Sequence, residues 1–469
     1  MNDQTSPEYS PGTSALETLK DKIYIHEMPS YGKKFFYALG FLALTSLVIL
    51  ITVGIIMAFK GPTWWLSAPL GIYFRSVHMW AVQAFMVILV CHVLVVFLTS
   101  GFKAPRRMVW VFGATIFCLA LIQSEFGYAL RGDFSSQYRN ISAADFWNGA
   151  HLGWYINPES FAQVFAIHTA IIPIFILLLF VLHYLLVRTY GLAKPYRADI
   201  AYKMIPAKHA PLFIRGGVLV VLIMVMAFLF PSPFVEPTRI TTVAQKDPAL
   251  MAQTLMQEFD HTSDTATYLN SIDPYTFDTR QVYVVIPYEK YIGSREQNAW
   301  SLFQNESQEQ QESDIAQAKQ YFGGSETLAT TSPSNPVVSM ISALAPMAKS
   351  GLYESAINQE NPNINYTYAT RFLTDTGVID AEAAMLHITT EEWGMTREET
   401  SSTSLLPLGS WWLAPIGVLN KTVLVNDPNG DRDGASILGV IMLIFILFPY
   451  IPYLNRLPEK LRLAPFIWK

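Results

Sequence analysis

Apolar residues in this chain gather into long uncharged runs that alternate with polar segments. The runs cover residues 35–59, 76–102, 108–124, 161–187, 216–235 and 436–454. A helix needs roughly 20 apolar residues to cross a hydrocarbon core about 30 Å thick, and most of the runs reach that length. The pattern predicts six membrane-spanning helices, the third continuing through Glu125 to about residue 130. Glu125 is expected near the interface or facing the bundle.

Two of these runs carry a histidine near each end, His78 with His92 and His168 with His183. Ionisable side chains inside a spanning helix are expensive, so four of them indicate ligands or partners. Steps of 14 and 15 residues at 1.5 Å per residue separate the histidines of each helix by roughly 21–22 Å, on nearly the same face. Two such helices side by side are predicted to hold two stacked metal centres. Neutral imidazole is a good ligand for haem iron, so haem is the expected cofactor.

Glycines in the first and third runs repeat the same step, Gly40 with Gly54 and Gly113 with Gly127. Glycine lets a bulky planar group approach a helix backbone. Two histidine helices and two glycine helices therefore predict a four-helix bundle around two haems. The sequence has no CxxCH, the attachment signature of c-type haem.

Positive charge marks one side of the predicted membrane protein. Lysines and arginines gather in the segments 103–107, 188–215 and 456–469. Alternating spans place these segments on one side, which the positive-inside rule makes cytoplasmic. Both termini are then cytoplasmic, in the inner membrane of a prokaryote, and the polar N-terminus shows no secretory signal.

Residues 238–405 are rich in polar residues and predict a soluble insert outside the membrane, of about ordinary domain size. QVYVVIPY (281–288) predicts a strand and PVVSMISALAPMAKSGLYESAI (336–357) a helix. The insert has no P-loop, nucleotide fingerprint or metal cluster in its sequence. A partner-docking or protective cap is the simplest interpretation.

The predicted fold is an all-α membrane protein: a four-helix dihaem bundle, two further transmembrane helices and a mixed soluble insert of unknown fold. Short surface helices are expected in the outer loop 131–160, and the tryptophans of the 60–74 loop are expected at the interface rather than in a site. The predicted divisions are an N-terminal tail with an interfacial helix at 1–30, the dihaem domain at 31–200, a fifth span at 201–237, the insert at 238–405, and a surface helix, sixth span and cytoplasmic tail at 406–469.

Residues 30–200 resemble cytochrome b of the quinol-oxidising cytochrome bc complexes, especially the plastid-type form of the bf complex. The matching text is RSVHMWAVQAFMVILVCH, FGYAL, AIHTAIIP and LLFVLHYLLVR, with the histidine and glycine steps described above. The last two spans resemble the short second part of that system, here fused and split by the insert. The resemblance implies that His78 and His168 ligate the outer haem iron, that His92 and His183 ligate the inner one, and that Arg75 pairs with a propionate.

Several positions depart from the family pattern. Arg131 and Gly132 replace a proline-tryptophan pair, Gln163 replaces an arginine, and Ala38 replaces the cysteine that attaches an extra haem in the plastid-type form. The family's Pro-Glu-Trp-Tyr, whose glutamate takes a proton from quinol, aligns with residues 409–412. Ser410 then stands at the glutamate, and serine is no base near neutral pH, so Glu392 of TEEWGM is the other candidate.

The resemblance implies a dihaem subunit of a membrane quinol/quinone oxidoreductase, akin to a quinol:cytochrome c reductase, with two b-type haems and a quinone as substrate. Expected partners are membrane lipid and a Rieske-type iron–sulfur protein or a multihaem cytochrome c. A homodimer is compatible with this function, and no nucleic acid is expected. The alternative is a membrane anchor or docking subunit whose haems only relay electrons, with quinone chemistry elsewhere. A transporter finds no support, because the sequence shows no inverted repeat.

Overall fold

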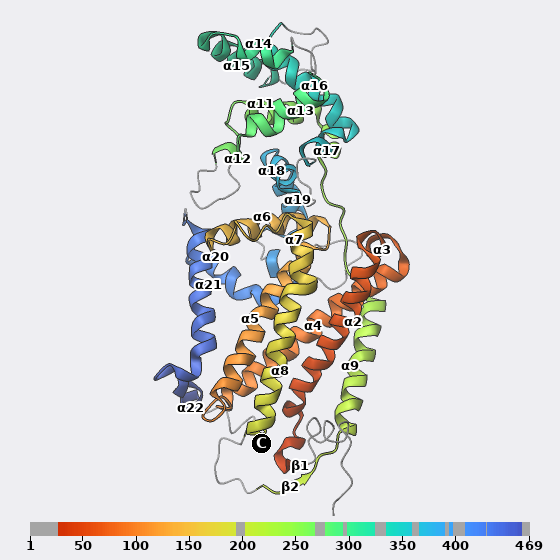
Figure 1. The fold of residues 1–469 in the computed structure, drawn as a ribbon, viewed down its shortest axis with the longest axis vertical. Coiled ribbons are helices and arrows are strands. Elements are labelled where there is room, and N and C mark those ends of the chain that lie inside the picture. Colours follow the sequence, from red (N-terminus) through yellow and green to blue (C-terminus); the bar gives the residue numbers. More distant parts are fainter. Residues whose placement is uncertain are drawn as a thin grey trace, which may run out of the picture.

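The computed structural model describes residues 27–193, 202–267, 277–293, 298–323, 334–358, 365–389, 394–396, 409–427 and 429–461. Within these ranges nearly all regular structure is helical, and the two strands form one short ribbon. A bundle of long helices carries a second group of short helices at one end (Figure 1). The predicted interfacial helix at 14–27 lies outside the described residues except for its last residue.

Six helices of the described chain are long and apolar enough to cross a membrane, which confirms the predicted number of spans. They are α2 (Leu39–Lys60, after the 3-10 turn η2, Phe35–Ala38), α4 (Pro69–Leu98), α5 (Arg107–Ala129), the continuous α7 (Phe161–Ala166), η3 (Ile167–Ile171) and α8 (Ile172–Tyr190), α9 (Ala210–Leu229), and α21 (Gly430–Leu447, continued by η8, Phe448–Tyr450). Each overlaps one of the apolar runs in the sequence.

The central bundle consists of α2, α4, α5 and α8. Helix α2 packs along α4, and α5 packs along α8, while α9 and α21 lie on opposite flanks (Figure 1). Apolar side chains such as Phe85, Met86 and Ala120 are buried between the helices. Large apolar side chains on the outer faces, such as Leu178 and Phe228, are exposed, as expected where the surrounding solvent is hydrocarbon.

Pro173 changes the course of the fourth span. Helix α7 passes into the π-helical turn η3, and α8 resumes at Ile172. Proline lacks a backbone N–H and its ring collides with the preceding turn, so a regular α-helix cannot pass it unchanged. The irregularity caused by Pro173 takes the form of this wider turn, and His168 lies within it.

The connections rich in lysine and arginine lie together at the end of the bundle opposite the insert. Strands β1 (Glu27–Pro29) and β2 (Met204–Pro206) pair antiparallel there, and the short helices η1 (Ser30–Lys33), η9 (Leu454–Arg456) and α22 (Leu457–Leu461) accompany them (Figure 1). The guanidinium of Arg106 donates to the carbonyls of Gly101 and Gly191. Lys103 forms an ion pair with Glu459 of α22.

Short helices lie across the other end of the bundle. They are α3 (Pro62–Ser67), α6 (Phe134–Gly149), η6 (Gly394–Thr396), η7 (Trp411–Leu413) and α20 (Ala414–Thr422). Helix α6 begins with a capping box, in which the Asp133 carboxylate accepts from the Ser136 backbone N–H at 3.0 Å. The surface helix expected in the 131–160 loop is confirmed as α6.

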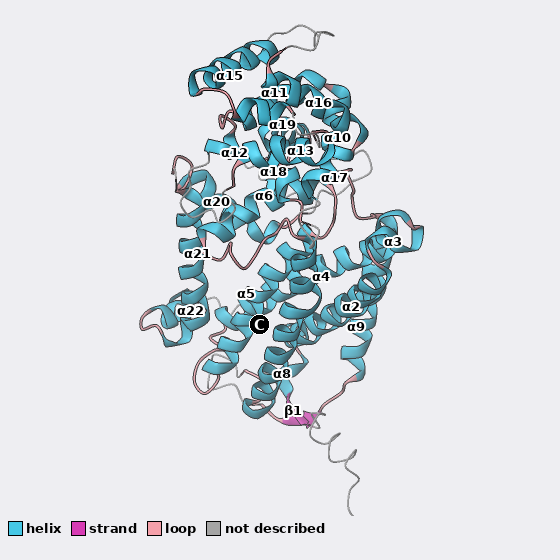
Figure 2. Cartoon of the chain, turned by 45° about the horizontal axis from the view of Figure 1, so that its top comes forward, coloured by secondary structure: helices cyan, strands magenta, loops and turns pink. Residues whose placement is uncertain are grey.

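The helices of the insert lie beyond α6 (Figure 2). They share one apolar core, to which Phe134 of α6 also belongs. Its described helices are α10 (Ile240–Lys246), α11 (Pro248–Phe259), α12 (Asp264–Thr267), the π-helical η4 (Arg280–Val285), α13 (Ile286–Tyr291), α14 (Ala299–Gln304), α15 (Gln308–Gly323), α16 (Pro336–Ser350), α17 (Leu352–Asn358), α18 (Thr367–Asp375) and α19 (Val378–Met385). The segment 336–357, predicted as one helix, is helical but forms two helices, α16 and α17, with Gly351 between them at φ +85°.

The strand predicted at 281–288 is wrong, because this segment is helical, as η4 followed by α13. Valine, isoleucine and tyrosine favour strands when judged locally. Here Tyr283, Val284 and Val285 are at most 1% exposed. Local strand preference is small and depends on context, and packing against the other helices of the insert outweighs it here.

Candidate functional site

Each of the four histidines in the bundle faces one of the four glycines singled out in the sequence. The facing pairs are Gly40 with His92, Gly54 with His78, Gly113 with His183 and Gly127 with His168. A Cβ built on Gly127 would lie 2.8 Å from Cε1 of His168, closer than the roughly 3.5–4.0 Å at which two carbon atoms normally pack. The glycines therefore make room for histidine rings, whereas the sequence had suggested only a planar cofactor.

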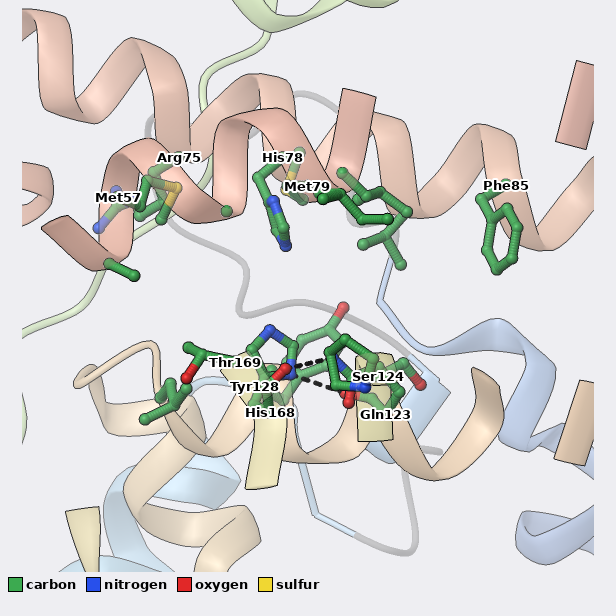
Figure 3. A pocket seen from close by; sticks show the side chains of 18 of the residues that line it. Met57, Arg75, His78, Met79, Phe85, Gln123, Ser124, Tyr128, His168 and Thr169 are labelled. Carbon is green, nitrogen blue, oxygen red and sulfur yellow. Dashed lines mark hydrogen bonds between the residues drawn. The ribbon is translucent and has the colours of Figure 1, made fainter. Parts of the chain in front are cut away.

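His78 and His168 face one another across a gap between α4 and η3 (Figure 3). Their ring centroids are 6.2 Å apart, and the ring planes are inclined by 65°. A metal ion bound by both would need about 2 Å to each nitrogen and roughly a further 1.1 Å to each ring centre, or about 6 Å in all. The pair therefore fits one iron held between two imidazoles.

Backbone carbonyls of α5 fix the orientation of the two histidines of the fourth span. Nδ1 of His168 lies 3.0 Å from the carbonyl oxygen of Gln123, and Nδ1 of His183 lies 3.0 Å from that of Val109. A carbonyl only accepts, so each Nδ1 carries the proton and donates it. The lone pair of each neutral imidazole is then on Nε2, the nitrogen left for a metal.

A cavity of about 260 Å³ surrounds His78 and His168. Most of its wall is apolar, contributed by α2, α4, α5 and α8, as in pockets that take a large hydrophobic cofactor. Trp65, expected to be an interfacial aromatic, is instead 4% exposed and lines this cavity. The side-chain amide of Gln123 donates to the carbonyl oxygen of His168 at 2.7 Å, and neither Gln123 nor Trp65 was identified from the sequence.

Two arginines line the cavity, and both donate to carbonyls of the segment that follows α9. Arg75 is buried, donates to the Ser232 carbonyl at 3.1 Å, and lies over the ring of Phe234. Arg131 pairs with Asp133 at 2.5 Å and donates to the Pro233 carbonyl at 3.1 Å. Two guanidinium groups at the rim suit two carboxylates of a bound cofactor. Arg131 was noted in the sequence only as a departure from the family, so its place here was missed.

The second histidine pair lies toward the basic end of the bundle. His92 and His183 are near enough to interact electrostatically, and the charge of Arg106 acts on both. Gly40 and Gly113 lie against these two rings. The basic end of the bundle thus also brings two histidines and two glycines together, with an arginine nearby.

The segment 409–413 packs between α4 and α5, beside the cavity around His78 and His168. Gln83 of α4 donates to the Gly409 carbonyl at 3.1 Å and accepts from the Trp411 indole at 3.0 Å. The Trp412 indole donates to Ser124 of α5 at 3.1 Å. Ser410 is completely buried and accepts from Arg139 of α6 at 3.1 Å. The other candidate from the sequence, Glu392, lies outside the described residues.

Comparison with known proteins points to one family. Residues 83–238 match the family model described as cytochrome b(N-terminal)/b6/petB, whose match begins five residues after His78. Cytochrome b6 of Heliobacterium modesticaldum is 28% identical over 192 residues, which cover 36% of this chain and 90% of that protein. Cytochrome b6 of Heliomicrobium gestii is 27% identical over the same length and coverage, and that of Pyropia yezoensis is 24% identical over 205 residues, 38% of this chain and 94% of its own.

A solved structure titled "Hyperthermophilic respiratory Complex III" contains a chain that aligns with 76% of this chain and 97% of its own length. The sequence identity is 16% and the TM-score is 0.38.

Proposed function

We propose that the membrane part of this chain is a divergent cytochrome b and that the protein is the dihaem subunit of a quinone-linked membrane redox complex, as the family match and the relatives support. The observation that carries the proposal is the set of four histidines, each seated against its own glycine in one helical bundle. A helical bundle that holds two stacked porphyrins needs a pair of imidazoles for each iron and small residues at the same level of the bundle.

His78 and His168 are proposed to hold the outer b-type haem, and His92 and His183 the inner one. The Gln123 and Val109 carbonyls keep two of these rings in the tautomer that can bind iron. Arg75 and Arg131 are proposed to neutralise the propionates of the outer haem. Each haem, when bound, supplies reversible one-electron transfer, and the apolar bundle excludes water from it.

We place the basic end of the bundle on the cytoplasmic side of a prokaryotic inner membrane. Both termini would then be cytoplasmic and the insert extracytoplasmic. Electrons would cross the membrane between a redox partner outside and a quinone. A Rieske-type iron–sulfur protein or a multihaem cytochrome c suits the partner role, and a homodimer is compatible with the exposed apolar faces of α8 and α9.

The second candidate is a membrane anchor whose haems only relay electrons. The observation that favours it is Ser410, a hydroxyl where the family has a proton-accepting glutamate. In that case quinone chemistry would reside in another subunit of the complex.

Quinol-driven haem reduction in the purified complex tests the proposal. Anaerobic addition of a short-chain quinol is expected to reduce b-type haem, followed by its α-band absorbance. A His183→Ala variant is expected to lose the inner haem and His168→Ala the outer one. A wild-type complex whose haems are reduced by dithionite but not by quinol would favour the anchor function, and a complex without b-type haem would overturn both.

A further inference from the structure

Glu125 is an acidic residue on a membrane-spanning helix that also lines the cavity around His78 and His168. Glu125 is on α5, in the last turn before the outer surface. Its carboxylate oxygen Oε1 is buried and has no hydrogen-bond partner among the described residues. A carboxyl group within a spanning helix is costly, and when it persists it generally serves proton transfer or ligand binding.

Three elements meet around Glu125. Ser410, from the inserted segment 409–413, forms a side-chain hydrogen bond with the Glu125 carboxylate, and the Arg139 charge on α6 acts on it. Arg139 also donates to Ser410 at 3.1 Å, so the hydroxyl stands between cation and carboxylate. The guanidinium lies 4.3 Å from the Tyr128 ring centre. The fold thus supplies the Glu125 carboxylate with a hydrogen bond from Ser410 and leaves its Oε1 without a hydrogen-bond partner among the described residues.

The cluster is joined to the wall of the cavity around His78 and His168 through α5. Ser124 and Tyr128 line that cavity (Figure 3), and Glu125 lies between them in the sequence of α5. Trp412 donates to Ser124, so the segment that brings in Ser410 also touches the cavity wall. Glu125 is therefore next in sequence to one cavity-lining residue and three residues from another.

We propose that Glu125 is the carboxylate that accepts the proton of quinol on the outer side of this protein, with Ser410 and Arg139 positioning it. This inference rests on the proposed quinone-linked function. In the step, a quinol O–H bond breaks and its proton forms an O–H bond on the Glu125 carboxylate. The accompanying electron leaves to a one-electron acceptor of the haem or iron–sulfur class.

The proposal explains how the 409–413 segment can carry serine. A serine hydroxyl cannot take up a proton near neutral pH, but it can hold a carboxylate that does. The carboxylate is supplied by α5, while the inserted segment supplies the hydrogen bond. Ser410 is therefore a positioning residue. The proton-accepting carboxylate is Glu125 on α5, and not a residue at the position of the family's glutamate.

The test compares the wild-type complex with Glu125→Gln, Glu125→Asp and Ser410→Ala, using quinol-driven haem reduction between pH 5.5 and 9. General-base contributions are about 100-fold or more, so Glu125→Gln is expected to slow reduction by about that factor and to flatten its pH dependence. Glu125→Asp is expected to retain the pH dependence at a lower rate, and Ser410→Ala to shift it. Asp145→Asn, which neutralises an α6 carboxylate near Arg371 (3.8 Å), is the matched control and is expected to behave as wild type.

Haem content and redox-difference infrared spectra separate proton transfer from a structural role. Glu125→Gln is expected to keep both haems and to lose one carboxyl band that changes on reduction. If Glu125 only balances the charge of Arg139, the double variant E125Q/R139Q would restore wild-type rates, and that result would overturn the proposal. Unchanged rates and pH dependence in Glu125→Gln would overturn it as well. No reduction by quinol in the wild type would instead show that the proposed function itself is wrong, and this role with it.

Discussion

Substituting the four bundle glycines by alanine is the sharpest test of how the histidines are seated. The distance from the added Cβ to the nearest ring carbon, Cε1, differs between the pairs: 2.8 Å at Gly127, 3.0 Å at Gly113, 3.4 Å at Gly54 and 3.6 Å at Gly40. Normal carbon contacts are about 3.5–4.0 Å, so Gly127→Ala must displace the His168 ring by roughly 0.7 Å or more. Gly40→Ala needs almost no displacement of His92.

The displacement at Gly127 has a calculable cost. Overpacking a close-packed interior generally costs about 1–3 kcal/mol. The ring cannot move freely, because its Nδ1 is held 3.0 Å from the Gln123 carbonyl oxygen. If the cost falls on haem binding, affinity for the outer haem drops roughly 5- to 150-fold. Gly40→Ala is expected to be neutral, since alanine is up to about 1 kcal/mol better than glycine in a helix and its methyl fits.

Haem quantification by pyridine haemochrome, with the α-band spectrum and redox titration, measures the effect. Gly127→Ala is expected to lose or perturb the outer haem while the inner one keeps its midpoint potential. The order of severity should follow the four distances, from Gly127 to Gly40. If Gly40→Ala proves as damaging as Gly127→Ala, or if Gly127→Ala keeps both haems unperturbed, the reasoning from ring contacts is refuted.

Two further predictions concern charge. Burial, and next the neighbouring Asp375, raise the pKa of Glu258 in the insert to about 10, so the free-energy cost of this group in the folded state grows as pH rises from about 4.5 toward 10. Glu258→Gln should therefore stabilise the insert by about 3 kcal/mol at pH 7 and by little below pH 4.5. Slower hydrogen exchange in α11 is the expected result, and exchange equal to wild type at pH 7 would contradict this. Arg75→Gln should lower the midpoint potential of the outer haem, because a cation favours the reduced form by roughly 1–2 kcal/mol at about 10 Å and a dielectric constant of about 20. Redox titration measures this, with Lys290→Gln as the control variant. An unchanged potential in Arg75→Gln would count against the prediction.

The spans and the histidine–glycine arrangement could be predicted because single-residue chemistry determines them. Uncharged runs of sufficient length have few alternatives to a membrane helix, and a step of 14 residues aligns side chains on one face by helix geometry alone. The pairing of each glycine with a particular ring could not be predicted. It depends on how α2 packs along α4 and α5 along α8, which the sequence pattern leaves open.

Other features escaped prediction because distant segments create them. Arg131 looked like a lost motif, and its place at the cavity rim depends on Pro233, about a hundred residues away. Trp65 was predicted to lie at the membrane interface, but helix α3 places it against the bundle, where it lines the cavity. Glu125 could be singled out as an acid in a span, but its partners Ser410 and Arg139 come from two other elements. The helical 281–288 segment shows the same limit, since burial from all sides outweighed its local strand preference.

Four imidazoles of this bundle are proposed to hold two haems, one above the other. The most direct test is a haem count per chain on the purified membrane complex, with electron paramagnetic resonance and redox titration of the wild type, His78→Ala and His92→Ala. The account predicts two low-spin b-type haems with distinct potentials, of which His78→Ala removes or alters one and His92→Ala the other. A wild-type complex with fewer than two b-type haems, or variants that both keep two unaltered low-spin haems, would contradict it.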